Sequence, residues 1–501
     1  MKASNNLFLE SYTCFVDWLR SCIINSTTIN DTLSFARIYG VVRWLNHDGL
    51  YHDDAIEVFV QEKVLQSKNY NAPSFTNNQN ETVVLASELY NQGGHSPVVL
   101  NWMMLFDVNK NHKLLVTRSI HKNFKESLLD KKIDYHLCTA KGLDLIIEIL
   151  NFAMNASRVV LHIHPNDIES AVAASILGKA GKKIIFYNHA DHVFTYGIGM
   201  ADMVCEVSAY GISLNHRLRR RKNFCLLGIP IKTNNTNYNY GLTRQSCSGL
   251  NILSCGNAAK YAPGNLFYGD FIDSLLQRKP EAIFLLIGPT GKEPWWKNYI
   301  DRWGESVRFL GVLDHAEYLK VLQFADVYVD SFPITGGSAF PEALLSGKLV
   351  AGIHQPIQGY SPADKLKVGS IVELTEHVIK LLERDMSSVS LEADVRTRTD
   401  FYHSLNRFRE NIITIYEEEP IAYEMPDIEV KTFWIENNWS ENQKIIIPSW
   451  LDFRELSPIN RMRFLIQLRK IFGFINYASF FKLIIAFFVN PGKLLKIREL
   501  L

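Results

Sequence analysis

A glycine-rich turn in the second half of the chain has the composition of a phosphate-binding loop. The segment VYVDSFPITGGSAFPEALL predicts a strand ending at Asp330, a loop, and a helix that begins near Ala339. The loop carries small residues: Thr335, Gly336, Gly337 and Ser338. Glycines let the backbone approach a ligand closely, and N–H groups at a helix start attract anions. Glu342, in the first predicted helical turn, can accept hydrogen bonds from ribose hydroxyls. In this order, the residues predict a nucleoside diphosphate site.

A second strand end in the same region adds a positive charge. The segment LNILSCGNAAKYAP predicts a strand followed by Gly256, Asn257 and Lys260. A lysine at this position can neutralise a pyrophosphate as a mobile point charge. Because ligands of open parallel sheets bind beyond the carboxyl ends of the strands, both loops should face the same ligand.

Histidines follow three predicted strands in the first half of the chain. They are His95 after the Gly93–Gly94 turn, His162 and His164 in LHIHP, and His189 and His192, with Asp191, in NHADH. Neutral imidazole accepts a proton near pH 7, so these groups suit acceptor recognition or general base catalysis. Two other interpretations of these histidines stay open. They can be structural histidines that are hydrogen-bonded to the backbone. They can also form a metal site, although His-x-Asp-His has no recognised metal-ligand spacing.

The elements that must position these residues alternate in type along the chain. Residues 1–80 predict a helical extension, and residues 81–245 and 246–420 each predict short apolar strands alternating with helices. The polar stretch 232–248 predicts a linker between the two, and residues 421–501 predict a helical tail. The fold class is therefore α/β, with two tandem doubly wound, Rossmann-like domains.

The amino-acid composition limits the kinds of binding partner and the cellular compartment that we expect for this protein. The chain has 501 residues, of which 47% are hydrophobic and 21% charged, and a formal net charge of +1, which argues against a nucleic-acid partner. Its seven cysteines include no Cys-x-x-Cys pair, which indicates reduced thiols. We find no signal-peptide pattern and no run of about 18 apolar residues, so we expect a cytoplasmic protein.

The glycine-rich region resembles the two-domain glycosyltransferases of the GT-B fold, in particular the O-GlcNAc transferase-like branch. The resemblance rests on Asp330, Gly336, Ser338 and Glu342, followed by Ala343, Leu344 and Gly347. It implies that Ser338 contacts the pyrophosphate of a nucleotide-sugar, for which we expect a UDP-sugar, and that Glu342 binds its ribose. Lys260 resembles the donor-phosphate lysine of that family, and the Gly-Gly-His turn resembles its acceptor-side loop. No bound metal is implied.

The resemblance also implies a base on the first domain that deprotonates an acceptor hydroxyl. We expect His95 to be this base, because it begins a helix on a glycine turn; His189, Asp191 and His192 are further candidates. Ile334 stands where retaining enzymes of this fold carry a second glutamate, which favours inversion. Ser338 and Ala339 replace the usual threonine pair, and Gly337 replaces a frequent histidine.

No tetratricopeptide array precedes the domains, so we expect a glycan or lipid-linked glycan acceptor, as in bacterial lipopolysaccharide or capsule synthesis, rather than a protein. The alternatives are a protein glycosyltransferase, an inactive GT-B-like binding subunit, and a nucleotide-sugar epimerase.

The C-terminal segment predicts attachment to a membrane surface. An apolar, aromatic run over residues 480–489 precedes Lys493, Lys496 and Arg498. Buried apolar area together with attraction to anionic lipid is what an interfacial anchor requires. The alternative is a C-terminal helix that packs back on the first domain.

Overall fold

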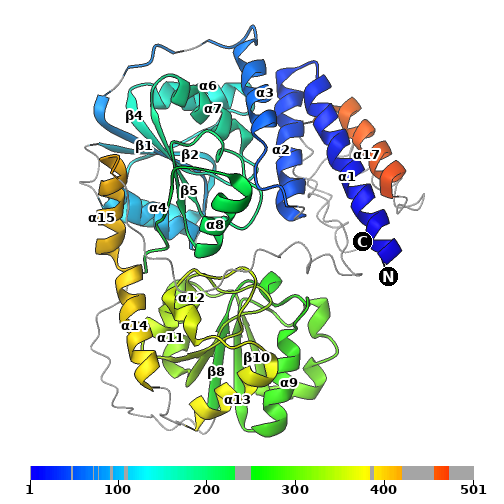
Figure 1. Cartoon of the computed structure of the whole chain (residues 1–501), viewed down its shortest axis with the longest axis vertical. Coiled ribbons are helices and arrows are strands. Elements are labelled where there is room, and N and C mark those ends of the chain that lie inside the picture. Colours follow the sequence, from blue (N-terminus) through cyan, green and yellow to red (C-terminus); the bar gives the residue numbers. More distant parts are fainter. Residues whose placement is uncertain are drawn as a thin grey trace.

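The computed structural model describes residues 2–46, 49–71, 73–76, 78–90, 94–105, 111–231, 250–383, 389–419 and 456–472. Within these residues the chain forms two α/β domains, each built on a parallel sheet, which lie one above the other in Figure 1. The predicted pair of tandem Rossmann-like domains is confirmed.

The first sheet has seven parallel strands in the order β3-β2-β1-β4-β5-β6-β7. The strands are β1 (Asn78–Leu89), β2 (His112–Ile120), β3 (Tyr135–Leu137), β4 (Ala156–His162), β5 (Lys183–Asn188), β6 (Met203–Glu206) and β7 (Phe224–Leu226). The helices that connect them are α4 (His95–Met104), α5 (Lys122–Asp130), α6 (Leu143–Ala153), α7 (Ile168–Lys179) and α8 (Ala209–Leu214), which continues into a π-helical turn, Asn215–Arg219. Helices cover both faces of this sheet. The strands β1 and β4 are therefore buried on both sides, and their sequences contain continuous apolar runs.

The second sheet has five parallel strands in the order β10-β9-β8-β11-β12. The strands are β8 (Leu250–Cys255), β9 (Ala282–Ile287), β10 (Val307–Gly311), β11 (Val327–Val329) and β12 (Leu349–Ala351). Its helices include α9 (Tyr268–Arg278), α10 (Ile300–Trp303), α11 (His315–Phe324), α12 (Ala339–Leu345) and α13 (Ile371–Leu382), with a 3-10 turn at Ala258–Tyr261. All five strands match predicted apolar runs.

The N-terminal extension is helical, as predicted, and joins the core of the first domain. It consists of α1 (Lys2–Asn25), α2 (Ile29–Leu45) and α3 (Asp54–Leu65). Thr28 and Asp53 cap α2 and α3 by accepting backbone N–H groups with their side chains. Buried residues of α2 and α3 share one apolar cluster with α6 and α7.

Two C-terminal helices pack on the first domain or its extension. In α15 (Leu405–Tyr416), Phe408, Ile412 and Ile415 are buried in the core of the first domain, although we had assigned residues 246–420 to the second. The hydroxyl of Tyr416 accepts a hydrogen bond from Trp102 Nε1 at 2.9 Å. The helix α14 (Val389–His403) leads from the second domain to α15 (Figure 1). An amphipathic pattern indicates a helix but not the domain that receives its apolar face.

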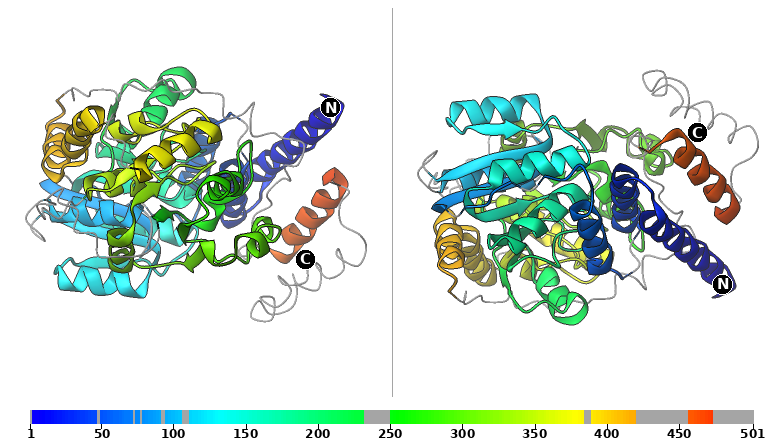
Figure 2. Two further views of the ribbon diagram at one scale, coloured as in Figure 1. Left: turned by 90° about the horizontal axis from the view of Figure 1, so that it is seen from below. Right: turned by 90° about the horizontal axis from the view of Figure 1, so that it is seen from above.

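The helix α17 (Pro458–Phe472) lies beside α1, as both views of Figure 2 show. The ring of Phe464 contacts those of Phe15 and Trp18, with centroids 5.6 and 5.4 Å apart. Residues 473–501, which carry the predicted membrane anchor, lie outside the described residues. Among the helices of the described chain, none is long and apolar enough to cross a membrane. Six cysteines are free, and Cys247 also lies outside the described residues.

Candidate functional site

The strand order reverses once in each sheet, between β1 and β4 and between β8 and β11. Loops that follow two such strands leave in opposite directions and open a crevice, where ligands of α/β proteins bind. The predicted site residues follow these strands. His95 comes after β1, His162 and His164 lie at the end of β4, Lys260 follows β8, and the segment 330–338 follows β11.

Asp330 holds the glycine-rich loop in shape. Its buried carboxylate accepts the N–H groups of Ser331 and Gly336 through Oδ1, both at 2.9 Å. Through Oδ2 it accepts the Thr335 hydroxyl and Lys367 Nζ, the latter at 2.8 Å. Because the Gly336 N–H points inward to Asp330, it is not free to bind an anion, contrary to our expectation. The N–H groups of Gly337 and Ser338 have no acceptor among the described residues.

Lys260 lies beside this loop, on the 3-10 turn after β8. Its Nζ donates to the Thr335 carbonyl at 2.8 Å, and Asn257 caps the turn by accepting the Lys260 N–H at 3.2 Å. Burial lowers the pKa of Lys260, and the Asp330 charge acts in the opposite direction. A Cβ on Gly256 would lie 3.1 Å from Lys260 Cδ, so a glycine is needed to leave room for the lysine stem. The predicted cation thus adjoins the predicted loop.

The helix α12 begins at Ala339, with Glu342 in its first turn, as predicted. Glu342 Oε1 lies 2.6 Å from Nε2 of His315, a residue that the sequence analysis did not select. This hydrogen bond raises the pKa of His315. A ribose would therefore meet a carboxylate that is already held in place by one partner.

Three histidines at or beyond the ends of the strands β1, β4 and β5 lie together in the first domain. The His95 ring is 4.0 Å from that of His189 and 5.9 Å from that of His162, between centroids. Burial lowers the pKa of His95 and of His162 to about 3, and that of His189 well below its usual value, with the neighbouring imidazoles contributing. All three are therefore neutral at pH 7. Neither ring nitrogen of the fully buried His162 has a partner among the described residues.

Asp191 and His192 belong to a different network. The buried carboxylate of Asp191 accepts the Ser208 hydroxyl at the start of α8, and its carbonyl accepts Arg219 Nη2 at 2.6 Å. Arg219 in turn pairs with the buried Glu206 at 3.2 Å. His192 Nδ1 lies 3.5 Å from Asp191 Oδ1. This arrangement fixes α8, so a catalytic role for Asp191 or His192 remains a prediction that the geometry does not support.

The two domains touch where the predicted site residues lie. A Cβ placed on Gly94 would come 3.7 Å from Ser338 Oγ, so the turn before His95 faces the glycine-rich loop. A second contact between the domains joins the N–H of Ala209 in the first domain to the carbonyl of Gly359 in the second, at 2.9 Å. Gly93 lies outside the described residues.

Further polar residues at the first crevice were missed by the sequence analysis. Arg118, in β2, donates through Nη1 to Asn166 Oδ1 at 3.0 Å, and the same nitrogen lies 3.8 Å from Glu88 Oε1. Trp44 of α2 meets the His164 ring edge-on, with centroids 4.5 Å apart. Arg118 could have been selected as a charge near a strand end. Trp44 could not, because its place depends on how the helical extension packs.

Comparisons with known proteins identify the fold. No protein-family model matches the chain, and no curated protein matches it in sequence. Solved structures do match. Anabaena HepE in complex with UDP superposes with a TM-score of 0.53 at 14% identity, over 68% of this chain and all of that one (100%).

Two further structures are similar. A glycosyltransferase from Rickettsia africae gives a TM-score of 0.51 at 12% identity, over 68% of this chain and 99% of that one. A mutant O-GlcNAc transferase from Thermobaculum terrenum gives 0.52 at 12% identity, over 77% of each chain. At these identities the likeness concerns the fold, and the chain has the GT-B fold that the sequence analysis expected.

Proposed function

We propose that this protein is a glycosyltransferase that moves a sugar from a nucleotide-sugar, preferably a UDP-sugar, to an acceptor hydroxyl. The observation that carries the proposal is the approach of the Gly94–His95 turn to Ser338, next to Lys260. It brings a neutral imidazole opposite a loop with two N–H groups, those of Gly337 and Ser338, that have no acceptor in the described part of the chain, and with a nearby ammonium. The structures of similar fold include complexes with UDP and with UDP-glucose, which supports the choice of donor.

The reaction follows from these positions. The acceptor oxygen attacks the anomeric carbon of the sugar, and the bond from that carbon to the β-phosphate oxygen breaks. The hydroxyl proton passes to His95, and the nucleoside diphosphate leaves toward Lys260 and the N–H groups of Gly337 and Ser338. Burial and the neighbouring imidazoles lower the pKa of His95 to about 3, which by itself makes it a weak base. The negative phosphates of a bound donor raise that pKa and so strengthen the base. The scheme needs no metal and gives inversion.

We place the acceptor among glycans or lipid-linked glycans of a bacterial surface, with the reaction in the cytoplasm, at or near the membrane. The hydrogen-bonding side chains of Arg118, Asn166 and His164, with Trp44 beside them, support a carbohydrate acceptor, because hydroxyl-rich rings need hydrogen-bond partners and an aromatic side chain against their apolar face. A protein acceptor, an inactive binding subunit and an epimerase are the outcomes that would replace this proposal.

The first test is ligand binding by the full chain. Thermal unfolding with UDP-, GDP- and CMP-sugars should show stabilisation by one nucleotide class, because a ligand of the native state alone raises its stability. Sugar transfer with the selected donor and an oligosaccharide panel then separates an enzyme from a binding subunit, and analysis of the unreacted donor detects epimerisation.

Substitution of Lys260 tests the donor site directly. Lys260→Ala should slow transfer by about a hundredfold, since removal of one charge partner of a transition state costs roughly 3 kcal/mol. Lys297→Ala, which removes an exposed lysine of the same domain, should leave the rate unchanged. A wild-type rate in Lys260→Ala would remove Lys260 from the site.

A further inference from the structure

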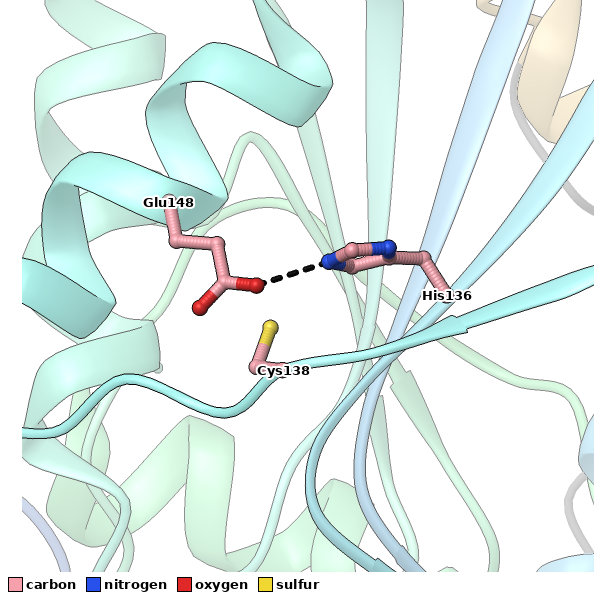
Figure 3. Close-up of side chains that lie close together, drawn as sticks. All are labelled: His136, Cys138 and Glu148. Atoms are coloured by element: carbon pink, nitrogen blue, oxygen red, sulfur yellow. Dashed lines mark hydrogen bonds and ion pairs between the residues drawn. The ribbon is translucent and has the colours of Figure 1, made fainter.

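A group of three potential metal ligands lies at the edge of the first domain, away from the crevice. His136 belongs to β3, Cys138 follows that strand, and Glu148 comes from α6. Figure 3 shows the three side chains pointing toward one another. Their ligand atoms all lie within 4.8 Å of one another, and His136 Nε2 is 2.7 Å from Glu148 Oε1. Among the described residues this is the one such group of three or more.

The local backbone explains why these side chains converge. His136 and Cys138 are two residues apart in extended chain, so they leave the strand on the same face. The following chain turns into α6, which brings Glu148 back over that face. The Cys138 N–H donates to the Val116 carbonyl at 2.9 Å, which fixes the position of the cysteine after β3 has ended.

Contacts outside the group orient two of the three ligands. Glu148 Oε2 accepts the Ala140 N–H at 3.2 Å, which leaves Oε1 directed at His136. The His136 ring stacks on Phe152, with centroids 5.4 Å apart and an interplanar angle of 27°. Such outer contacts are what hold ligands in place at metal sites in proteins.

We propose that His136, Cys138 and Glu148 bind one zinc ion. Imidazole nitrogen, thiolate sulfur and carboxylate oxygen together are ligands that suit Zn²⁺ better than Mg²⁺ or Ca²⁺. Tetrahedral zinc separates such atoms by about 3.4–3.7 Å. His136 Nε2 and Glu148 Oε1 lie 2.7 Å apart and all three ligand atoms lie within 4.8 Å of one another, so small side-chain movements suffice. Water completes the fourth position, which is open on the side of the exposed His136. Binding replaces the hydrogen bond of His136 with Glu148 and releases the thiol proton to solvent.

The proposed zinc site stabilises β3, which is an edge strand of the first sheet. β3 spans three residues and, within the described part of the chain, pairs with β2 alone, so few backbone hydrogen bonds hold it. A metal bound to the strand and to α6 ties that edge to the helix layer. The proposed zinc site does not include the glycine-rich loop, so a failure to bind zinc would leave the proposed transfer reaction untouched.

The test uses the full chain, stripped with a chelator and titrated with zinc and with cobalt. We expect one equivalent of zinc to bind and to raise the unfolding temperature by about 3 °C or more. Cobalt should give a thiolate charge-transfer band in the near ultraviolet. Cys138→Ala and His136→Asn should each abolish stoichiometric binding, while Cys14→Ala, at an exposed cysteine of α1, should keep it.

His136→Asn changes an exposed side chain, so loss of binding there cannot be ascribed to misfolding. Absence of stoichiometric binding to the wild type would overturn the site. So would zinc affinity that is equal in the wild type and in both ligand variants, since the metal would then lie elsewhere and His136 and Glu148 would form an ion pair alone.

Discussion

His95 lies between two neutral imidazoles and the glycine-rich loop of the second domain, so its pKa depends on the charge of a ligand bound beside it. We expect His95→Ala to abolish transfer and to leave nucleotide binding intact, because the donor contacts that we propose come from the second domain. Calorimetric titration with the nucleoside diphosphate and a transfer assay measure the two effects separately. His121→Ala, at an exposed histidine, serves as the control. Transfer by His95→Ala with an unchanged pH profile would exclude the base role.

His162 makes the stability of the protein sensitive to acid. Its pKa is about 3 when folded and about 6.5 when unfolded, so below pH 6.5 the unfolded chain binds the proton and the folded chain does not. Stability is therefore complete above pH 6.5 and falls as the pH drops toward 3, by on the order of 2 kcal/mol at pH 5 from this residue. Urea unfolding at pH 7 and pH 5 should show a smaller loss in His162→Leu than in the wild type. An equal loss would mean that His162 is protonated in the fold.

The sequence predicted where Lys260, Ser338 and Glu342 lie in the fold better than it predicted their contacts. Lys260, Ser338 and Glu342 could be selected because each follows a strand or begins a helix in a recognisable order. Lys367, which holds Asp330, lies 37 residues beyond it in the chain and follows no pattern. His315 beside Glu342 was missed for the same reason. Contacts between side chains distant in sequence require the packed fold.

At the scale of elements, the helix α3 docks on the first domain through a buried acid. Glu57 Oε2 accepts the N–H of Gly197 at 3.0 Å, and Oε1 has no partner among the described residues. Burial raises the pKa of Glu57 to about 8, so the folded state holds a proton that the unfolded chain, with a pKa near 4.5, releases. Stability conferred by this proton is present below pH 4.5 and is lost as the pH rises toward 8.

We therefore expect Glu57→Gln to unfold at a higher urea concentration than the wild type at pH 8, and to gain less or nothing at pH 5. The ionisation removed is worth on the order of 3 kcal/mol at pH 7. Glu62→Gln, at an exposed position on the same helix, is the matched control. If the wild type and Glu57→Gln lose stability in parallel between pH 5 and pH 8, Glu57 is ionised in the fold.

Periodicity identified the strands with clear apolar runs, including the three-residue β11 and β12, and missed β3 and β7. The runs at 82–89, 158–162 and 250–255 are strands that are buried between helices. β3 and β7 have three residues each and lie at the two edges of the first sheet, where each pairs with one neighbouring strand among the described residues. The domain on which α15 packs could not be predicted either. The surface that buries the apolar face of α15 forms only when the first domain folds.

At the scale of the whole molecule, the proposed transfer reaction needs residues of both domains, which contact each other at Gly359 and Ala209. A Cβ on Gly359 would lie 2.7 Å from Cβ of Ala209, and the φ of +85° is one that glycine adopts readily. We expect Gly359→Ala to separate the domains and to reduce transfer, while nucleotide affinity, which depends on the second domain, changes little. Gly304→Ala tests the backbone alone, since Gly304 has a φ of +50° and no atom within 4 Å of its Cβ. Equal activity of the two variants would show that the Gly359 contact does not govern transfer.

The return of α15 to the first domain has a consequence for how the protein is made. Domains generally fold in order as they leave the ribosome. Here the first domain has emerged through β7 long before Phe408, Ile412 and Ile415, which complete its core, have been synthesised. Until then the apolar surface around Trp102 stays uncovered. The core of the nascent first domain therefore stays incomplete until the second domain has been synthesised. A pause in translation after residue 380 would leave this incomplete core exposed to chaperones or to aggregation.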